Sequence, residues 1–529
     1  MVTTVTMARP ESNLGRPTHI PSPRKQPFPG LPTLAGGMLL ACLPLWTSAA
    51  QWDGAARLSV SETYTDNLRL SVNDEEHESI TQINPGFSLT GRGGRASVAA
   101  DYTMQNLFYA HNPDRNGTKH QLSAAGQSEL VKDWFYFDAN ASISQQLVSP
   151  GDRLAQDNLN LAGNRSDVVT LQVEPYIRRQ LGGYATTELR YSHGWVDYDT
   201  DGVSDTESSV ASAYLANGYD ASHLFWRIGY REQRDIRDTA PDSVRQSTDG
   251  FIRYRALSTL SLVAYAGRVE NDIQTNRPNA DGSYWSAGFI WQPSPKFSLE
   301  GTKGENDERG RLTWMPSTRT SIAIGYRHRE VGLNTGETWD GNITHRTRRS
   351  TWSLSYTEEV TSVQVLQLRE FQSLIVLDLQ GGVAFDPGTG EFVDLTNPFE
   401  LTDEEFLRTR AQGSVNYRTG KSTLSLSLYN ETRTYELSAQ ELDSQGGTAA
   451  WQWRFASRTS SRLSVQAQRF EVLNSSDSAD SVTTRLSLNR QISPRTSGRV
   501  ELSHLEADVA GSGEEYDENR IAVHVNMTF

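Results

Sequence analysis

The chain has 529 residues, a formal net charge of −14 and a hydrophobic content of 36%. Beyond the N-terminal region it has no apolar run of about 18 residues or more, which excludes a helical membrane protein. The composition is compatible with a membrane β-barrel, because only alternate residues of a barrel strand face lipid. The acidic balance disfavours a nucleic-acid partner.

The N-terminal region has the order of a secretory signal. The basic residues Arg24 and Lys25 precede an apolar stretch and then small residues that end at Ala50. This order predicts a signal peptide over residues 1–50. The single cysteine, Cys42, lies inside it, and a lipoprotein-type cleavage there is the less favoured alternative. We therefore expect the mature chain to lack disulfides, thiol chemistry and Cys-ligated metals.

The remainder of the chain, residues 51–529, is a long series of short segments in which apolar and polar residues alternate. Examples are residues 224–230 and 449–455. A period of two predicts β-strands whose two faces meet different surroundings, and no long amphipathic helix is evident. The first strand is expected at residues 52–64, which leaves no room for an N-terminal plug domain.

The connections between these segments alternate in length and chemistry. Short turns rich in proline, glycine, serine and arginine fall at residues 91–95, 131–133, 292–296, 315–319, 419–421, 456–460 and 493–497. Longer acidic connections fall at residues 73–78, 111–118, 197–207, 272–281 and 508–517. This is the layout of a transmembrane barrel, with short turns in the periplasm and long acidic loops outside.

Counting in this register gives about 24 strands, within a range of about 22–26. We therefore predict a single-domain, all-β, antiparallel up-and-down barrel in the bacterial outer membrane. An even number of strands puts both barrel ends on the periplasmic side. A β-propeller would repeat a blade motif every 40–50 residues or so, which is not seen, and a soluble sandwich seldom has this many strands.

One connection, residues 359–406, is far longer than the others. It contains an apolar run at 374–377 and a turn at 386–388, and Thr402 with Glu405 has the spacing of a capping box, which predicts a short helix there. A barrel this wide leaves a central hole. Our hypothesis is that this long loop folds inward and constricts the lumen. The alternatives are a surface lobe and an extra hairpin.

The strand alternation places one set of polar side chains on the inward face. The candidate lumen-facing residues are Arg227, Arg231, Arg311, Arg485, Arg520 and His524. With many Ser, Thr, Asn and Gln residues and some carboxylates, they predict a hydrophilic lining of mixed sign that suits water, sugars or ions. The alternative is that these side chains only solvate one another. The strand tryptophans are interpreted as membrane-interface girdles rather than as sugar-stacking platforms.

Catalytic and cofactor signals are weak. The motifs of zinc proteases, serine hydrolases and phosphate-binding loops are absent from the sequence, so we expect neither enzymatic activity nor a cofactor. Asp197, Asp199 and Asp201 match the first half of a calcium loop, but no glutamate stands where the bidentate ligand is expected. A solvated acidic loop is the favoured interpretation.

The last strand has the clearest alternation. Its apolar face includes Val523, Val525, Met527 and Phe529. These four residues resemble the C-terminal signal that the barrel assembly machinery reads. That machinery and the outer-membrane lipid are therefore expected partners.

Two further segments indicate a family. Residues 62–68 (ETYTDNL) end the first strand, and residues 83–86 (INPG) lie on the second. With the run of hairpins up to Phe529, they resemble the outer-membrane β-barrel family associated with PEP-CTERM/exosortase systems. The resemblance implies a pore or secretion channel for extracellular polysaccharide, with polysaccharide export components as candidate partners. A structural or adhesive barrel without transport activity is the alternative.

Overall fold

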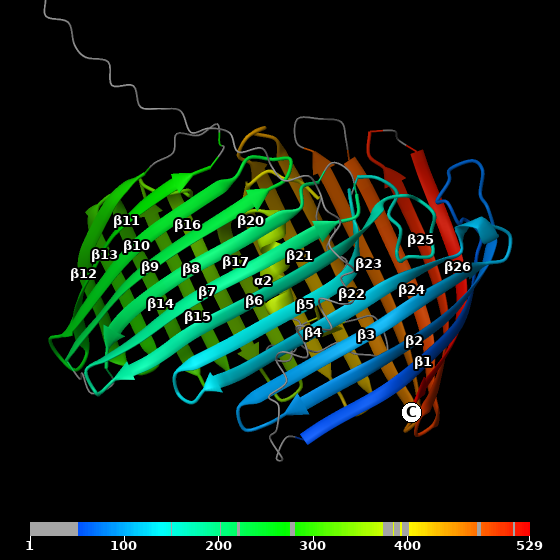
Figure 1. Ribbon diagram of the computed structural model, residues 1–529, viewed down its shortest axis with the longest axis horizontal. Helices are drawn as coiled ribbons and strands as arrows, with labels where there is room; N and C mark the ends of the chain where they lie inside the picture. The colour runs from blue at the N-terminus through cyan, green and yellow to red at the C-terminus, as the bar shows by residue number, and fades with distance from the viewer. Residues whose placement is uncertain are drawn as a thin grey trace, which may run out of the picture. The chain divides into compact units, whose positions relative to one another are not determined.

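The computed structural model describes most of the chain after residue 50 (Figure 1). The described residues are 51–149, 151–200, 203–218, 223–273, 275, 281–373, 384–385, 392–393, 401–472, 478–511 and 514–529. The expected signal peptide, residues 1–50, lies outside them, as do the apolar run at 374–377 and the turn at 386–388.

Twenty-four strands form one antiparallel sheet in which each strand pairs with the next barrel strand along the chain. They are β1 (Gln51–Thr65), β2 (Glu78–Arg92), β3 (Ala96–Tyr109), β4 (Gly117–Val131), β5 (Phe135–Leu147), β6 (Arg165–Leu181), β7 (Ala185–Tyr198), β8 (Thr206–Asn217), β9 (Leu224–Arg237), β10 (Ser243–Arg255), β11 (Leu260–Asp272), β12 (Gly282–Ser294), β13 (Phe297–Glu305), β14 (Asp307–Ser317), β15 (Thr320–Arg329), β16 (Gly336–Arg346), β17 (Ser350–Thr361), β20 (Phe406–Arg418), β21 (Ser422–Tyr435), β22 (Glu441–Ala456), β23 (Thr459–Val472), β24 (Ser478–Ser493), β25 (Thr496–Val509) and β26 (Glu514–Thr528). The last strand pairs with the first, from Thr528 opposite Arg57 to Arg520 opposite Thr65, which closes the barrel. The predicted all-β barrel of 24 strands is confirmed.

In the described residues, four smaller elements lie outside this sheet. They are the 3-10 helix η1 (Pro113–Arg115), the helix α2 (Val363–Ser373) and the short strands β18 (Ala384–Phe385) and β19 (Phe392–Val393), which pair with each other. Among the residues described, no helix is both long and apolar enough to cross a membrane.

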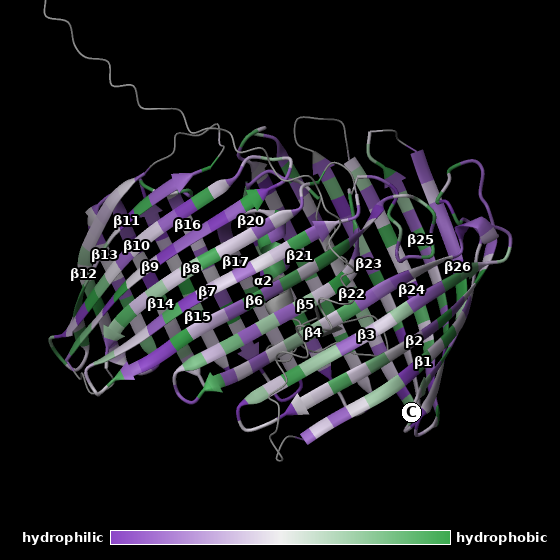
Figure 2. Ribbon diagram, in the orientation of Figure 1, coloured by the Kyte–Doolittle hydropathy of each residue, from purple (hydrophilic) through white to green (hydrophobic). Residues whose placement is uncertain are grey.

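The outward face of the barrel is apolar. On β21, Leu424 and Leu428 are 49% and 56% exposed, whereas Ser425 on the other face is 5% exposed. Bands of hydrophobic and hydrophilic residues alternate in this way along the whole wall (Figure 2). Leaving so much aliphatic surface in water is unfavourable by about 25 cal/mol per Å². A closed antiparallel barrel with an apolar outer face is an outer-membrane structure, and this chain lies in the bacterial outer membrane.

The strand tryptophans share this outward face. Exposed fractions between 40 and 51% are found for Trp285, Trp291, Trp314, Trp352, Trp451 and Trp453. Outward-facing tryptophans fit the girdle interpretation, because an amphipathic ring is favoured where lipid meets water. Sugar-stacking platforms in the lumen must therefore be sought among other aromatic residues.

The two ends of the barrel differ as expected. One end has only short turns, such as residues 93–95 and 295–296, and it also holds both ends of the barrel sheet. This turn end faces the periplasm in outer-membrane barrels. The opposite end, which we call the loop end, carries the longer connections. Its exception is the link between β13 and β14, where Asn306 alone makes the turn at a φ of 59° that asparagine tolerates.

The long connection has its helix in a different place from the one predicted. Thr402 accepts a hydrogen bond from the Glu404 amide at 3.2 Å, but Phe406 already begins β20 opposite Thr361. The prediction of a helix at 402–407 is wrong because pairing with β17 extends the chain there. The observed helix, α2, escaped notice because Gln364 and Gln367 are buried together with aliphatic residues, so its sequence shows no clear polar stripe.

Candidate functional site in the barrel lumen

Two chain segments fold into the barrel from its loop end. One is the connection between β5 and β6, residues 148–164, which we call the inward loop. The other is the described start of the connection between β17 and β20, which is Ser362 followed by α2 (Figure 1). Each segment contacts strands that are distant around the wall from the strands at its own ends. Both segments therefore reach across the lumen.

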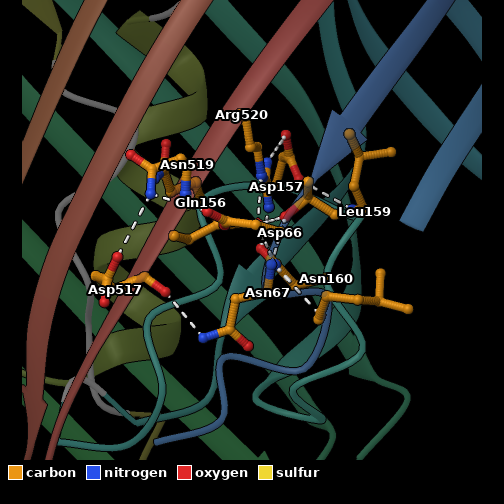
Figure 3. A network of polar contacts seen from close by, with 12 residues as sticks. Asp66, Asn67, Gln156, Asp157, Leu159, Asn160, Asp517, Asn519 and Arg520 are labelled. Atoms are coloured by element: carbon orange, nitrogen blue, oxygen red, sulfur yellow. Dashed lines mark hydrogen bonds and ion pairs between the residues drawn. The ribbon is translucent and has the colours of Figure 1, made fainter. Parts of the chain in front are cut away.

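A buried polar network fixes the inward loop at the seam between β1 and β26 (Figure 3). Arg520 on β26 donates to Asp157 of the loop at 2.9 Å and to Glu518 at 2.6 Å, and it also donates to Asn160. Glu518 accepts two more hydrogen bonds, from Asn160 at 3.0 Å and from Thr65 at 2.6 Å. Glu518 has no solvent exposure and Arg520 only 8%. Buried charges of this kind are stable only when they are paired. The inward loop supplies partners for these charges, so it stabilises the wall at this seam.

Asp157 is the charged contact of the inward loop itself. Burial opposes its ionisation, but the Arg520 guanidinium and the amide of Leu159 outweigh burial and hold the pKa of Asp157 below its usual range. Asp157 is therefore ionised and paired with Arg520 at neutral pH.

Apolar packing supports the inward loop on both sides of this network. Leu159 packs in a buried cluster with Leu68, Ile80, Leu107 and Tyr109. Ala155 packs in a second cluster with Leu70, Leu505, Ala507 and Tyr516. Between them, Gln156 accepts a hydrogen bond from Arg485 on β24 at 2.9 Å. The loop thus bridges the walls made by β1–β3 and by β24–β26.

Helix α2 lies against the inner wall at β6 and β7, roughly half-way round the barrel from β17. A Cβ atom on Gly194 would lie 2.8 Å from Leu368, so the glycine leaves the room that the helix uses. Tyr198 donates to Gln367 at 2.7 Å, and Gln367 donates to Gln146 at 2.8 Å. These contacts satisfy both polar groups of a buried glutamine side chain.

An apolar core joins the two walls at the level of α2. The helix contributes Val363, Leu366 and Leu368. One wall contributes Val168, Val196 and Tyr198. The other contributes Phe406, Tyr435, Leu442 and Phe470. Side chains from opposite walls thus meet through the helix inside the barrel.

Ion pairs and hydrogen bonds fix the described end of the long connection, residues 401–405. Glu405 is buried, forms an ion pair with Arg245 at 2.5 Å and accepts a hydrogen bond from Arg237 at 3.3 Å. Asp403 accepts two hydrogen bonds from Ser204, one from its amide at 2.9 Å and one from its hydroxyl at 2.7 Å. These acidic residues tether the connection to β9, β10 and the link between β7 and β8.

The six residues predicted to face the lumen have different surroundings. Arg520 and Arg485 contact the inward loop, and Arg485 also pairs with Glu501 at 3.0 Å. His524 lies on the same face of β26 as Arg520 and is partly buried. Within the described part of the chain, no carboxylate lies within 4 Å of the remaining three, which are Arg227, Arg231 and Arg311. The Arg227 guanidinium lies 5.0 Å from the ring centre of Tyr214.

Arginine pairing with buried carboxylates is common elsewhere on the inward face. Glu431, 1% exposed, forms ion pairs of 2.6–2.9 Å with Arg408, Arg410 and Arg433. Asp307, also 1% exposed, is paired at 2.7 and 2.8 Å with Arg309 and Arg329. These shared carboxylates neutralise much of the positive charge of the wall.

The three aspartates that match half of a calcium loop have different surroundings. Asp197 lies in β7, the amide of Asp199 donates to the Asp167 carbonyl at 3.0 Å, and Asp201 lies outside the described residues. No group of three or more potential metal ligands occurs in the part of the chain that the structure describes.

The proposed assembly residues end the closing strand. Val523 and Phe529 are exposed, and Val525 and Met527 are partly covered by the neighbouring strands. The amide of Phe529 donates to the carbonyl of Ala56 on β1 at 2.9 Å, so the backbone pairing continues to the last residue. Recognition of these residues by the assembly machinery stays a prediction.

Sequence reasoning missed the inward loop as a functional segment. Its proline, glycine, asparagine and aspartate residues are typical of an ordinary surface loop. The signal that could have identified it is a set of three leucines, at 154, 159 and 161, within an otherwise polar connection. A loop exposed to water gains nothing from such residues.

No family model and no curated protein matches the chain. Several solved structures are similar to it at low identity. One is a mutant ferric enterobactin receptor, PfeA, from Pseudomonas aeruginosa in complex with enterobactin (TM-score 0.45, 10% identity, 91% of this chain and 82% of that chain). Another is the FrpB iron transporter, F3-3 variant, from Neisseria meningitidis (TM-score 0.44, 10% identity, 93% and 83%). A third is the outer membrane protein opdK from Pseudomonas aeruginosa (TM-score 0.34, 9% identity, 90% and 99%).

Proposed function

We propose that the protein is an outer-membrane channel that exports extracellular polysaccharide. The observation that carries the proposal is a hydrophilic interior crossed by two segments that polar contacts hold in place. We further propose that the inward loop and residues 359–406 constrict this channel at rest. The choice of polysaccharide depends on the resemblance of residues 62–68 and 83–86 to a family linked with polymer export.

The contacts of the inward loop suit a constriction that opens. The Asp157 side chain is 47% exposed, so water or a charged solute replaces its contact with Arg520 at modest cost, whereas the buried pair of Glu405 with Arg245 anchors the long connection. The wall itself is a continuous ladder of strand pairs, which opens far less readily than a loop. Release of the loops would therefore widen the pore without unfolding the barrel.

Single-channel recording in planar bilayers tests the constriction. The double variant Asp157→Asn/Asn160→Ala should open more often and to larger conductance than the wild type, because the loop loses its network. Asp152→Asn is the matched control, since Asp152 is in the same loop and accepts a hydrogen bond only from the adjacent Arg153 amide among the described residues. If removal of residues 152–161 and 364–400 together left the conductance of a folded barrel unchanged, the constriction would be refuted.

Gene deletion tests the cargo. Loss of the channel should reduce cell-surface polysaccharide and leave the polymer in the periplasm. The competing candidate is a structural or adhesive barrel. It predicts an electrically silent protein whose loop deletions change surface attachment while polysaccharide stays at its normal level. Polysaccharide export components and the barrel assembly machinery are the proposed partners, and co-purification with the intact barrel would detect them.

A further inference from the structure

The turn end of the barrel contains a basic pocket. A cavity of about 260 Å³ lies on the inward face of β20–β23. Its charged lining residues are Arg418, Lys421, Arg454 and Arg462. Its neutral polar residues include Thr423, Ser425 and Gln452. We call these seven residues the mouth pocket, because the turn end is the periplasmic mouth of an outer-membrane barrel.

Strand register builds the mouth pocket. Arg418 on β20 is opposite Thr423 on β21, Thr423 is opposite Gln452 on β22, and Gln452 is opposite Arg462 on β23. Arg418 and Arg462 thus flank a hydroxyl group and an amide group in one row across the sheet. The Cα atoms of these two arginines are about 14 Å apart, which is three strand spacings. Arg454, two residues nearer the turn, adds a third cation on the same face.

Two arginines of this pocket, Arg418 and Arg454, differ from the paired arginines elsewhere on the wall. Among the residues that the structure describes, no carboxylate lines the cavity. Along the row, the first carboxylate is Glu501, two strands beyond Arg462, and it is already paired with Arg485 and Arg499. Within the described residues, Arg418 and Arg454 form no ion pair. By contrast, Glu431 on the same wall forms ion pairs with three arginines.

The surroundings extend the positive field. Other basic residues of the turn end that form no ion pair in the described part of the chain include Arg92, Arg95, Arg255, Arg346, Arg349 and Arg495. On the far wall, Arg227 and Arg253 lie beside the rings of Tyr214 and Phe225. A chain with a net charge of −14 thus gathers cations at one end. Walls of one sign at a mouth concentrate ions of the opposite sign.

We propose that the mouth pocket binds an acidic sugar unit of the polymer as it enters from the periplasm. Guanidinium groups bind carboxylates through paired hydrogen bonds, and the hydroxyl and amide groups between them suit sugar hydroxyls. The cavity is slightly smaller than the 300 Å³ or so at the lower end of small-molecule pockets, which fits one sugar unit at a time. This inference rests on the proposed channel function and names its substrate as an anionic polysaccharide.

Isothermal titration of the full-length protein in detergent tests the pocket, with tetragalacturonate and its carboxyl-reduced neutral tetramer as probes. The wild type should bind tetragalacturonate at least tenfold more tightly than the neutral tetramer. The variant Arg418→Gln/Arg454→Gln should lose this preference. The matched control Arg490→Gln/Arg495→Gln removes the same charge from the same end of the barrel outside the cavity, and it should keep the preference within about twofold. Heat-modifiable gel migration verifies that every variant is folded.

Three results would overturn the proposal. The first is equal binding of both tetramers, and the second is an equal loss in both double variants, which would indicate a general field rather than a pocket. The third is binding of phosphatidylglycerol vesicles, but not of tetragalacturonate, in a manner that depends on Arg418 and Arg454, which would make this a lipid site. The conductance of the Asp157→Asn/Asn160→Ala variant does not depend on this binding experiment. A negative binding result would therefore refute the pocket and leave the channel function to be judged by conductance.

Discussion

At the residue scale, the wall depends on buried carboxylates that each hold several arginines. Glu431 is the clearest case, because Arg408, Arg410 and Arg433 all pair with it away from water. Glu431→Gln should destabilise the folded barrel by about 3–5 kcal/mol, since three guanidinium groups lose their counter-charge. Urea unfolding in lipid vesicles measures the change.

The control for this prediction is Glu471→Gln on β23. Glu471 pairs with Arg469 at 3.8 Å, and both side chains are more than two-fifths exposed. An exposed pair of this kind contributes less than about 1 kcal/mol. A similar loss of stability in the two variants would show that burial at Glu431 does not matter.

The pairing of Asp157 with Arg520 gives the channel a pH dependence. Because the pKa of Asp157 is lowered by the contact, the pair is complete above the ordinary aspartate pKa of about 3.9 and is lost as the pH falls through the lowered value. Channel openings should therefore be unchanged between about pH 8 and 5 and should rise below about pH 4. Asp157→Asn should open frequently at every pH, and a retained acid response in this variant would assign the effect to another group.

At the element scale, each strand has two faces that meet different solvents. On β21, Leu428 is 56% exposed on the outward face, and its neighbour Ser427 is on the inward face. Leu428→Arg should cost about 2–4 kcal/mol, because the charge enters hydrocarbon. Ser427→Arg, one residue away, should cost less than about 1 kcal/mol in a wet lumen. Equal costs, measured by the same unfolding titration, would contradict the membrane orientation.

The same two-faced pattern explains what the sequence could predict. Alternation over residues 224–230 or 449–455 repeats many times, so the strands, their turns and the barrel class were all predictable. Helix α2 and the inward loop were not, because both bury apolar and polar residues together and carry no periodic signal. The acidic residue Glu405 was interpreted as part of a local capping box, whereas its partners Arg237 and Arg245 are distant in sequence.

At the scale of the whole molecule, the closure of the wall is the feature on which the channel depends. Val60 on β1 is directly opposite Val525 on β26, and both lie on the outward face. Opposed Cα atoms in antiparallel strands are about 4.5–5.5 Å apart, which a disulfide can bridge. Val60→Cys/Val525→Cys should therefore form a disulfide that changes migration on a non-reducing gel.

The control pair for closure is Val60→Cys/His524→Cys. His524 is one residue away on the inward face, so its side chain and that of residue 60 point to opposite sides of the wall. This pair should not bridge. Bridging in both pairs, or in neither, would contradict the register at the seam.

Charge placement is also a property of the whole molecule. The inward face was predicted to be of mixed sign, and along the chain basic and acidic residues are indeed interspersed. Only strand register shows that some arginines share a carboxylate while Arg418, Arg454 and Arg462 gather in one cavity. Such grouping arises between residues on different strands, so a linear pattern does not reveal it.

The pairing of β1 with β26 has a consequence for biogenesis. Strand β1 can pair with β26 only after β26 has been synthesised and exported. The barrel therefore cannot close while the chain is still incomplete. Until then two strand edges stay unsatisfied, and exposed edges invite aggregation. The unclosed chain therefore needs chaperones while it crosses the periplasm. A chain that lacks β26 should form no channel.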